Sequence, residues 1–185
     1  MTVVKRTTKE ILNRNLARAK PPLLDRTTLW LHDIRSMYNV GSAFRTGDAF
    51  GINQICLSGY TPQPPRPEIS KTALGAEKCV TWNHYSNGAE ALSNMKAQDS
   101  YLVSIEQTNH SKPLTDFHLP EQRPVILIFG NEVTGLDEDI LHLANEYIEI
   151  PQFGQKHSFN VSVSIGIVLY HIFLSGHKGT EDERS

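Results

Sequence analysis

The residues best suited to chemistry lie in the last third of the chain, at positions 123–175. The apolar run 125–129 is rich in β-branched residues and is bounded by proline and glycine, which predicts a buried strand. The polar turn 130–135 follows it, and a second expected strand, 147–150, leads into the Gly/Gln/Lys/His/Ser loop 152–158. Ligands of open α/β sheets bind at the carboxyl ends of strands. These two loops are therefore predicted to form a cofactor site.

A second group of polar residues follows the predicted strand 27–31. Asn39 is expected to cap a helix whose apolar positions recur at helical spacing and which ends at Gly51. Asn39, Ser42 and Arg45 fall roughly on one face of that helix. The helix dipole disfavours a cation near a helix N-terminus, so stability alone does not explain Arg45. Arg45 is either an ordinary surface cation or a residue that binds an anion.

Several common kinds of site are not favoured by the sequence. No glycine-rich dinucleotide fingerprint joins a strand to a helix, and the polar turn 130–135 lacks the lysine of a P-loop. The eight histidines are scattered and show no zinc spacing with the cysteines, so we expect no metal ion. Ser158 stands beside His157 but outside the context of a nucleophile elbow, which argues against a hydrolase triad.

The elements that must position these residues alternate between strand and helix. We expect strands at 27–31, 53–57, 79–82, 101–105, 125–129 and 147–150, and helices at 8–19, 40–50, 88–97 and 160–174. The stretch 58–70 contains four prolines and is expected to be a stiff surface loop, and 106–120 is expected to be a second loop. The alternation favours one mostly parallel, three-layered α/β domain at 27–175.

The charges are unevenly distributed. Residues 1–26 hold seven basic and two acidic side chains, a net charge of +5, which leaves −7 for the other 159 residues. Thr7 and Glu10 form a plausible capping box for the helix at 8–19. We expect this basic N-terminal extension to place its apolar side on the body or on a second subunit. Its positive charge suits a polyanionic partner. The alternative is a solvated surface helix without a partner. The charged tail 176–185 is expected to be disordered.

Length and composition are those of an ordinary globular protein. The chain has 185 residues, of which 39% are hydrophobic and 21% charged, enough for one domain with a sizeable core. No apolar run is long enough to cross a bilayer, and the start lacks the apolar segment of a signal peptide. The two cysteines, Cys56 and Cys79, are expected to be buried free thiols. We therefore expect a cytoplasmic protein without a membrane partner.

Three blocks, in order, give the chain a specific resemblance. They are Asn39-x-Gly41-x-x-x-Arg45; Ile128-Phe129-Gly130-Asn131-Glu132-x-x-Gly135-Leu136; and Ile150-Pro151 through Ser158-Phe159-Asn160-Val161-Ser162-Val163 to the helix that contains Gly166. Over about residues 29–173 the chain resembles the SpoU/TrmH family of RNA 2′-O-ribose methyltransferases, in the SPOUT superfamily. The resemblance implies a three-layer α/β/α fold with a mostly parallel sheet and a C-terminal deep trefoil knot. It also implies S-adenosylmethionine as cofactor and a homodimer with active sites at the subunit interface.

The resemblance also implies roles for particular residues. Arg45 matches the family's catalytic arginine; because it is always protonated, phosphate binding and alkoxide stabilisation suit it better than acting as a free base. Asn39 would fix Arg45 or the ribose, and Glu132 would hold the cofactor loop or Arg45. Ser158 and Asn160 would order the knot loop and reach the substrate, although Asn160 could instead simply cap the last helix. The implied cofactor-binding residues are Ile105, Phe129, Gly130, Asn131, Ile150, Gln152, Ser158 and Phe159.

Two residues depart from the family pattern. Gln152 stands where methionine is common, and Phe159 where leucine or methionine is usual; both would line the cofactor pocket. The chain has no room for a separate RNA-binding domain, so the basic helix would have to do that work. The sequence leaves open whether the substrate is tRNA or rRNA. A catalytically silent RNA-binding SPOUT module and a small-molecule α/β enzyme are the alternatives.

Overall fold

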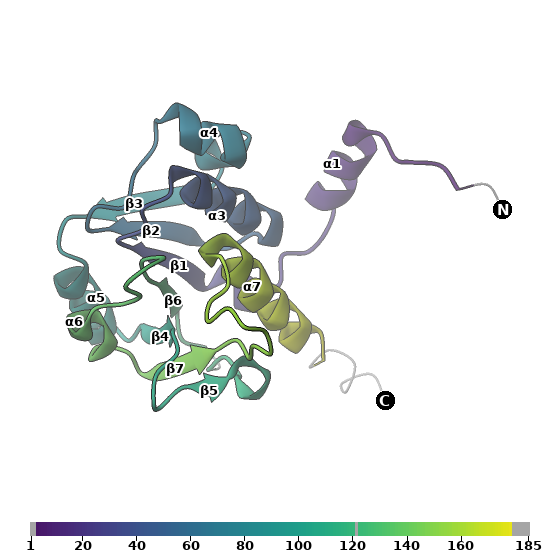
Figure 1. Cartoon of the computed structure of the whole chain (residues 1–185). Helices are drawn as coiled ribbons and strands as arrows, with labels where there is room; N and C mark the ends of the chain where they lie inside the picture. Colours follow the sequence, from purple (N-terminus) through teal and green to yellow (C-terminus); the bar gives the residue numbers. More distant parts are fainter. Residues whose placement is uncertain (1–2, 121, 179–185) are drawn as a thin grey trace.

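The centre of the fold is a seven-stranded parallel sheet, seen in a computed structural model that describes residues 3–120 and 122–178 (Figure 1). The strands follow the order β3-β2-β1-β6-β4-β7-β5, and every pair of neighbours is parallel. This confirms the predicted mostly parallel α/β sheet. The strands are β1 (Thr27–His32), β2 (Gln54–Ser58), β3 (Thr81–Tyr85), β4 (Tyr101–Ile105), β5 (Lys112–Pro113), β6 (Val125–Phe129) and β7 (Glu146–Glu149).

The two central strands are the most apolar ones, as burial on both faces requires. Every residue of β1 and β6 is buried. Their register pairs Trp30 with Ile128 and Leu31 with Phe129, so both strands end at the same edge of the sheet. The segments that follow them, 33–39 and 130–136, are thereby brought side by side.

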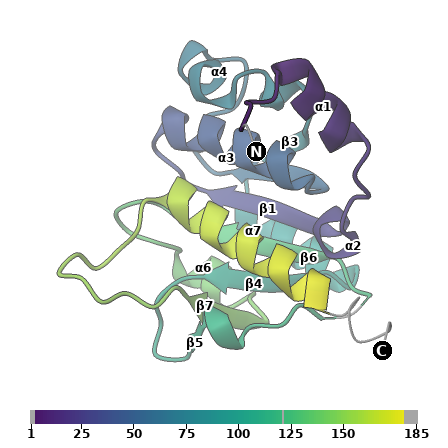
Figure 2. The same cartoon turned by 90° about the vertical axis from the view of Figure 1, so that its right-hand side faces the viewer.

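Helices cover both faces of the sheet, which gives the expected three layers. Figure 2 looks onto one of these faces. One face carries α2 (Pro22–Asp25), α3 (Met37–Phe50), α4 (Pro67–Ala73) and α7 (Val161–Lys178). The other face carries α5 (Gly88–Ala97) and α6 (Glu138–Leu141). On the first face, α7 packs against α2 and α3.

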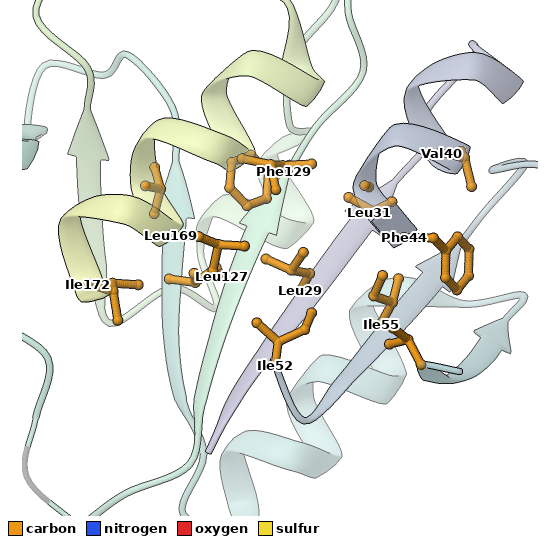
Figure 3. Packing of buried hydrophobic residues seen from close by; sticks show 14 of the residues in the cluster. Leu29, Leu31, Val40, Phe44, Ile52, Ile55, Leu127, Phe129, Leu169 and Ile172 are labelled. Carbon is orange, nitrogen blue, oxygen red and sulfur yellow. The ribbon is translucent and has the colours of Figure 1, made fainter. Parts of the chain in front are cut away.

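The larger core lies between the sheet and the first group of helices (Figure 3). Leu29 of β1 and Leu127 of β6 lie beneath Leu169 of α7, and all three are fully buried. Truncating such a side chain to alanine costs about 2–5 kcal/mol of stability, because it leaves a cavity as well as removing buried surface. This packing holds α3 and α7 in place over the ends of the strands.

Helix α1 (Thr8–Leu16) stands apart from this core (Figure 1). The predicted capping box is confirmed, since the Thr7 side chain accepts from the Glu10 backbone N–H and Glu10 reaches back to the Thr7 N–H at 2.7 Å. The helix ends three residues earlier than predicted and buries none of its side chains. Its apolar residues Ile11, Leu12 and Leu16 are exposed, so the helix does not lie on the body of its own chain.

Some element boundaries differ from the predictions. The proline-rich loop ends at residue 66, because Pro67 occupies the first turn of α4, where its missing N–H is not needed. The stretch 106–120 contains β5 and the short helix η2 (Leu114–Asp116). Helix α7 continues to Lys178, so residues 176–178 of the predicted disordered tail are helical. Residues 179–185 lie outside the described part of the chain.

The prediction of a buried thiol was wrong for one of the two cysteines. Both cysteines are free, but Cys56 is buried in β2 whereas Cys79 is exposed. Cys79 follows the short helix η1 (Ala76–Lys78), and strand β3 begins two residues later than expected, at Thr81. Burial raises the pKa of the Cys56 thiol to about 11, which keeps it protonated and unreactive at neutral pH.

Candidate active site

A cavity of about 360 Å³ opens where β4, β6 and β7 end. Its walls come from the ends of these strands, the loops that follow them and the first residues of α7. The structure places all eight implied cofactor-binding residues in this lining: Ile105, Phe129, Gly130, Asn131, Ile150, Gln152, Ser158 and Phe159. Segments that are far apart in the sequence therefore meet at the edge of the sheet where ligands of this architecture bind.

Asn131 shapes the loop after β6. Only 7% of the residue is exposed, and its amide makes four hydrogen bonds. The side-chain oxygen accepts from the backbone N–H groups of Val133 and Thr134, at 2.8 and 3.0 Å. The side-chain nitrogen donates to the Asp33 carbonyl at 2.8 Å and to the Tyr60 hydroxyl at 2.6 Å. Because the amide is fully used in these contacts, Asn131 acts on the cavity through the loop it holds.

Two glycines and a carboxylate close the same loop. A Cβ atom at Gly130 would lie 2.6 Å from the Gly135 carbonyl carbon, so only glycine permits this close approach. Gly135 has a φ of +70°, and a Cβ there would lie 2.4 Å from Oε2 of Glu106. Glu106 accepts from the Leu136 N–H at 3.0 Å. Sequence reasoning missed Glu106; its signal was an acidic residue directly after a strand that ends at the site.

Glu132 joins the loop after β6 to the start of α3. Its carboxylate accepts from the backbone N–H groups of Arg35 (2.9 Å) and Ser36 (3.1 Å) and from Nδ2 of Asn39 (2.9 Å). Burial raises the pKa of Glu132, but the hydrogen bonds from Arg35, Asn39 and Ser36 together outweigh it, so the pKa lies below its ordinary value. The carboxylate is therefore ionised at neutral pH.

The predicted capping role of Asn39 was wrong. Helix α3 begins at Met37, and its cap is Ser36, whose hydroxyl accepts from the Asn39 N–H at 3.3 Å. Asn39 thus lies in the first turn, with its side chain free to bind Glu132. Serine and asparagine cap helices equally well, so the sequence could not show which residue is the cap. It also could not show the bond between Asn39 and Glu132, which lie far apart in the chain.

Asn160 caps α7 and also reaches across to α3. Its side-chain oxygen accepts from the Ser162 N–H at 2.9 Å, and its side-chain nitrogen donates to Oδ1 of Asn39 at 3.1 Å. One side chain therefore makes both the capping bond and the bond to Asn39. Glu132, Asn39 and Asn160 form a continuous chain of hydrogen bonds between the loop after β6, α3 and α7.

Arg45 lies two turns along α3 and is exposed. It makes no hydrogen bond or ion pair with any residue that the structure describes, and it is absent from the described lining of the cavity. The expected contacts of Asn39 or Glu132 with Arg45 are thus not made within the described part of the chain. No described residue neutralises the charge of the guanidinium.

The loop between β7 and α7 forms one wall of the cavity. Ser158, which was predicted to order this loop, lines the cavity beside Phe159. The loop is fastened at the His157 carbonyl, which accepts from Nε2 of Gln107 at 2.8 Å and from Nε2 of Gln152 at 3.4 Å. Sequence reasoning also missed Gln107, which follows β4 directly after Glu106.

A cluster outside the cavity, His32, Asp33 and Asp137, has side chains of the types that bind metals. Nε2 of His32 lies 3.0 Å from Asp137, and Nδ1 lies 2.7 Å from the Ser58 hydroxyl. Since a carboxylate only accepts, we assign the ring proton to Nε2, with Nδ1 accepting from Ser58. These bonds hold the ends of β1 and β2 to the start of α6.

This parallel sheet, with a cavity at its strand ends and a final helix over one face, matches solved structures of RNA methyltransferases. The structure of an AdoMet-bound rRNA methyltransferase from Sinorhizobium meliloti superposes with a TM-score of 0.74 and 27% identity, covering 79% of this chain and 55% of that one. Residues 26–170 match the SpoU rRNA methylase family, and the chain belongs to this family.

Similar proteins carry names for both tRNA and rRNA substrates. A tRNA (guanosine(18)-2′-O)-methyltransferase from Borreliella burgdorferi is 28% identical over 94% of this chain and 79% of its own length. A 23S rRNA (guanosine-2′-O-)-methyltransferase from Neisseria meningitidis is 30% identical over 82% of this chain and 58% of its own length. The chain thus spans little more than half of the Neisseria and Sinorhizobium proteins.

Proposed function

We propose that this protein transfers a methyl group from S-adenosylmethionine to a ribose 2′-hydroxyl of RNA, either tRNA or rRNA. The observation that carries the proposal is the hydrogen-bonded chain Glu132–Asn39–Asn160, which ties the cavity loops to the helix that bears Arg45. Membership of the SpoU family supports the same reaction.

The cavity fits this cofactor chemically. Ile105, Phe129 and Ile150 provide apolar walls for an adenine ring, and the glycine loop exposes backbone groups at close range. The carboxylates of Glu106, Glu132 and Glu149 also line the cavity and suit a ligand that carries a sulfonium and an ammonium group. When bound, the cofactor supplies an electrophilic methyl group.

The protein's own residues contribute orientation and charge. In-line displacement needs the 2′-oxygen aligned with the methyl carbon, and such alignment alone can supply a large part of the rate acceleration. Arg45, exposed and without a partner in the described chain, would bind the phosphate next to the target ribose and stabilise the developing alkoxide.

We further propose a homodimer in which Arg45 completes the cavity of the partner subunit. In its own chain Arg45 is not part of the described cavity lining. Helix α7 leaves Val163, Tyr170 and Leu174 about half exposed (48%, 54% and 43%), and their spacing puts them on one face of the helix. A second copy packed on this face would bury it beside the open cavity.

The C-terminal trefoil knot and the division of the chain belong to the same proposal. Two features support a knot: the late strand β6 lies between β1 and β4, and α7 returns over the sheet to pack on α2 and α3. We assign residues 27–175 to the catalytic domain and residues 1–26 to a basic extension that binds RNA.

We place the enzyme in the cytoplasm, where its RNA substrates are made. The two free cysteines suit a reducing compartment. Among the described residues, no helix is both long and apolar enough to cross a membrane.

The test is incubation of the purified protein with radiolabelled S-adenosylmethionine and separate pools of unmodified tRNA and rRNA, followed by mapping of labelled 2′-O-methyl nucleotides. We expect label in one pool, and its loss by at least about 100-fold in Arg45→Ala with cofactor affinity unchanged. Arg45→Lys keeps the charge but not the planar fork and serves as the matched control. RNA binding without label would favour the silent RNA-binding module instead, and full activity of Arg45→Ala would exclude the proposed role of Arg45.

A further inference from the structure

Tyr60 is a large aromatic residue that lies exposed in a tightly held loop. Its own backbone N–H donates to Asp33 at 3.0 Å, and the Gly59 N–H donates to the Tyr85 carbonyl at 3.1 Å. The next residue, Thr61, is buried, and its hydroxyl bonds to the Leu31 and Ser58 carbonyls. In spite of these anchors, 60% of Tyr60 remains exposed.

The Tyr60 side chain is held at its far end as well. Its hydroxyl accepts from Nδ2 of Asn131 at 2.6 Å, and Asn131 lines the cavity. The ring is therefore fixed at both ends next to the cavity while much of its surface stays open to solvent. A ring that is already immobilised loses little conformational entropy when a flat ligand stacks on it.

A cationic residue follows closely in the chain after the aspartate that holds Tyr60. Asp33, which holds the Tyr60 backbone, is two residues before Arg35, and the Arg35 N–H donates to Glu132. Arg35 is exposed, and no hydrogen bond or ion pair joins its side chain to the described residues. Aromatic rings and guanidinium groups are the side chains that recognise the base and the phosphate of a nucleotide.

We propose that Tyr60 stacks on a base of the RNA bound at the cavity. The inference rests on the proposed function and adds a residue that positions the substrate. Bases within a duplex are stacked on one another and cannot cover the Tyr60 ring, whereas bases in loops, bulges and ends can. Tyr60 is thus a positioning residue for RNA, separate from the groups that bind the cofactor.

Three variants separate stacking from a structural role. Tyr60→Leu keeps an apolar side chain but removes the aromatic face, Tyr60→Phe keeps the ring and removes the hydroxyl, and Tyr60→Trp enlarges the ring. Affinity for the RNA pool that the wild type methylates is measured at several salt concentrations, together with KM, kcat and cofactor affinity. A second RNA carries an abasic residue at the methylated nucleotide.

We expect Tyr60→Leu to raise KM and Kd for RNA about tenfold, within the roughly 5- to 150-fold range of one stacked base, with kcat and cofactor affinity little changed. The salt dependence of binding should not change, because no charge is lost. Tyr60→Phe and Tyr60→Trp should stay within about threefold of the wild type. On the abasic RNA the wild type and Tyr60→Leu should bind equally.

Two results would overturn the inference and leave the proposed function intact. One is RNA binding by Tyr60→Leu equal to that of the wild type. The other is an equal loss in Tyr60→Phe and Tyr60→Leu, which would make the bond to Asn131 the cause. Failure of the wild type to bind or methylate any RNA would instead overturn the proposed function, and this inference with it.

Discussion

A single carboxylate, that of Glu132, fastens the loop after β6 to the start of α3. Its pKa is lowered from 4.5, so its ionised form is favoured in the folded chain. The stability that this provides is fully present above the pKa of the unfolded chain and is lost as the pH falls through the lower folded pKa. The site should therefore weaken in acid.

The first prediction concerns Glu132→Gln. The amide keeps the shape but loses the charge that attracts three N–H donors, so the free energy of unfolding at pH 7 should fall by roughly 1–2 kcal/mol. The difference from the wild type should shrink as the pH falls below 4.5, because the unfolded chain then takes up the proton more readily than the folded chain. Denaturant titrations at neutral and at acidic pH measure this; a difference independent of pH would contradict it.

The two roles of Asn160 can be separated by substitution. Asn160→Ser keeps a capping oxygen for α7 but is too short to donate to Asn39, whereas Asn160→Ala removes both contacts. We expect Asn160→Ala to lose about 1 kcal/mol of stability, and Asn160→Ser to stay near the wild type. Both variants should lose methyl transfer to a similar extent. If Asn160→Ser kept full activity, the bond to Asn39 would have no part in the reaction.

The structure brings together residues that the sequence predicted for the site, but not all their contacts could be predicted. Sequence reasoning placed Asn39, Glu132 and Asn160 together through a family resemblance, and the structure joins them by hydrogen bonds. It could not choose Ser36 over Asn39 as the cap, because both residue types cap helices well. It missed Glu106, whose bond to Leu136 depends on the neighbouring positions of two strands, β4 and β6.

At the scale of elements, α1 offers a clean test because it buries nothing. The test variant replaces the basic residues in and next to this helix by glutamine: Lys5, Arg6, Lys9, Arg14 and Arg18. The free energy of unfolding of the body should stay within about 0.5 kcal/mol of the wild type. RNA binding should weaken, and the slope of log affinity against log salt should fall by up to about 4, as five phosphate contacts are lost. Filter binding at several salt concentrations measures this.

A truncated chain that begins at residue 20 is the companion to that variant. If the charges alone matter, it should match the glutamine variant in affinity. If the salt dependence of RNA binding were unchanged in both variants, α1 would be a solvated surface helix with no part in RNA binding.

The accuracy of the predicted elements follows the strength of their end signals. Helix α5 and strands β4 and β6 have the predicted bounds. Asn87 caps α5, a short polar stretch precedes β4, and a proline and a glycine flank β6. The start of α4 was missed because Pro67 lies in a proline-rich run and reads as a loop residue. Strand β5 has two residues and carries no periodic pattern at all.

At the scale of the whole molecule, the proposed dimer makes a prediction about mixed subunits. Arg45→Ala and Glu132→Ala should each be inactive as homodimers. If Arg45 serves the partner's cavity, a mixed dimer holds one intact site, so mixing the two variants should restore about a quarter of wild-type activity. If Arg45 serves its own chain, no mixture regains activity. Methylation assays after subunit exchange, with dimer mass checked by light scattering, decide between them.

The order of the strands lay beyond the reach of sequence patterns. Alternating strands and helices predicted a parallel sheet, and that was confirmed. The same pattern fits many strand orders, because each buried strand shows a similar apolar run. The pairing of β6 with β1 and the packing of α7 on α3 both join residues that lie far apart in the sequence.

The position of β6 has a consequence for the nascent chain. Both strands that flank β6 are synthesised before it, so the middle of the sheet is missing until residue 129 has left the ribosome. The growing chain must hold β1 and β4 apart, or separate them again, to admit the late strand. A fragment of residues 1–122 should therefore show no cooperative unfolding transition, although it contains five of the seven strands. This protein would mature near the end of translation, and its emerging first half would depend on protection from aggregation.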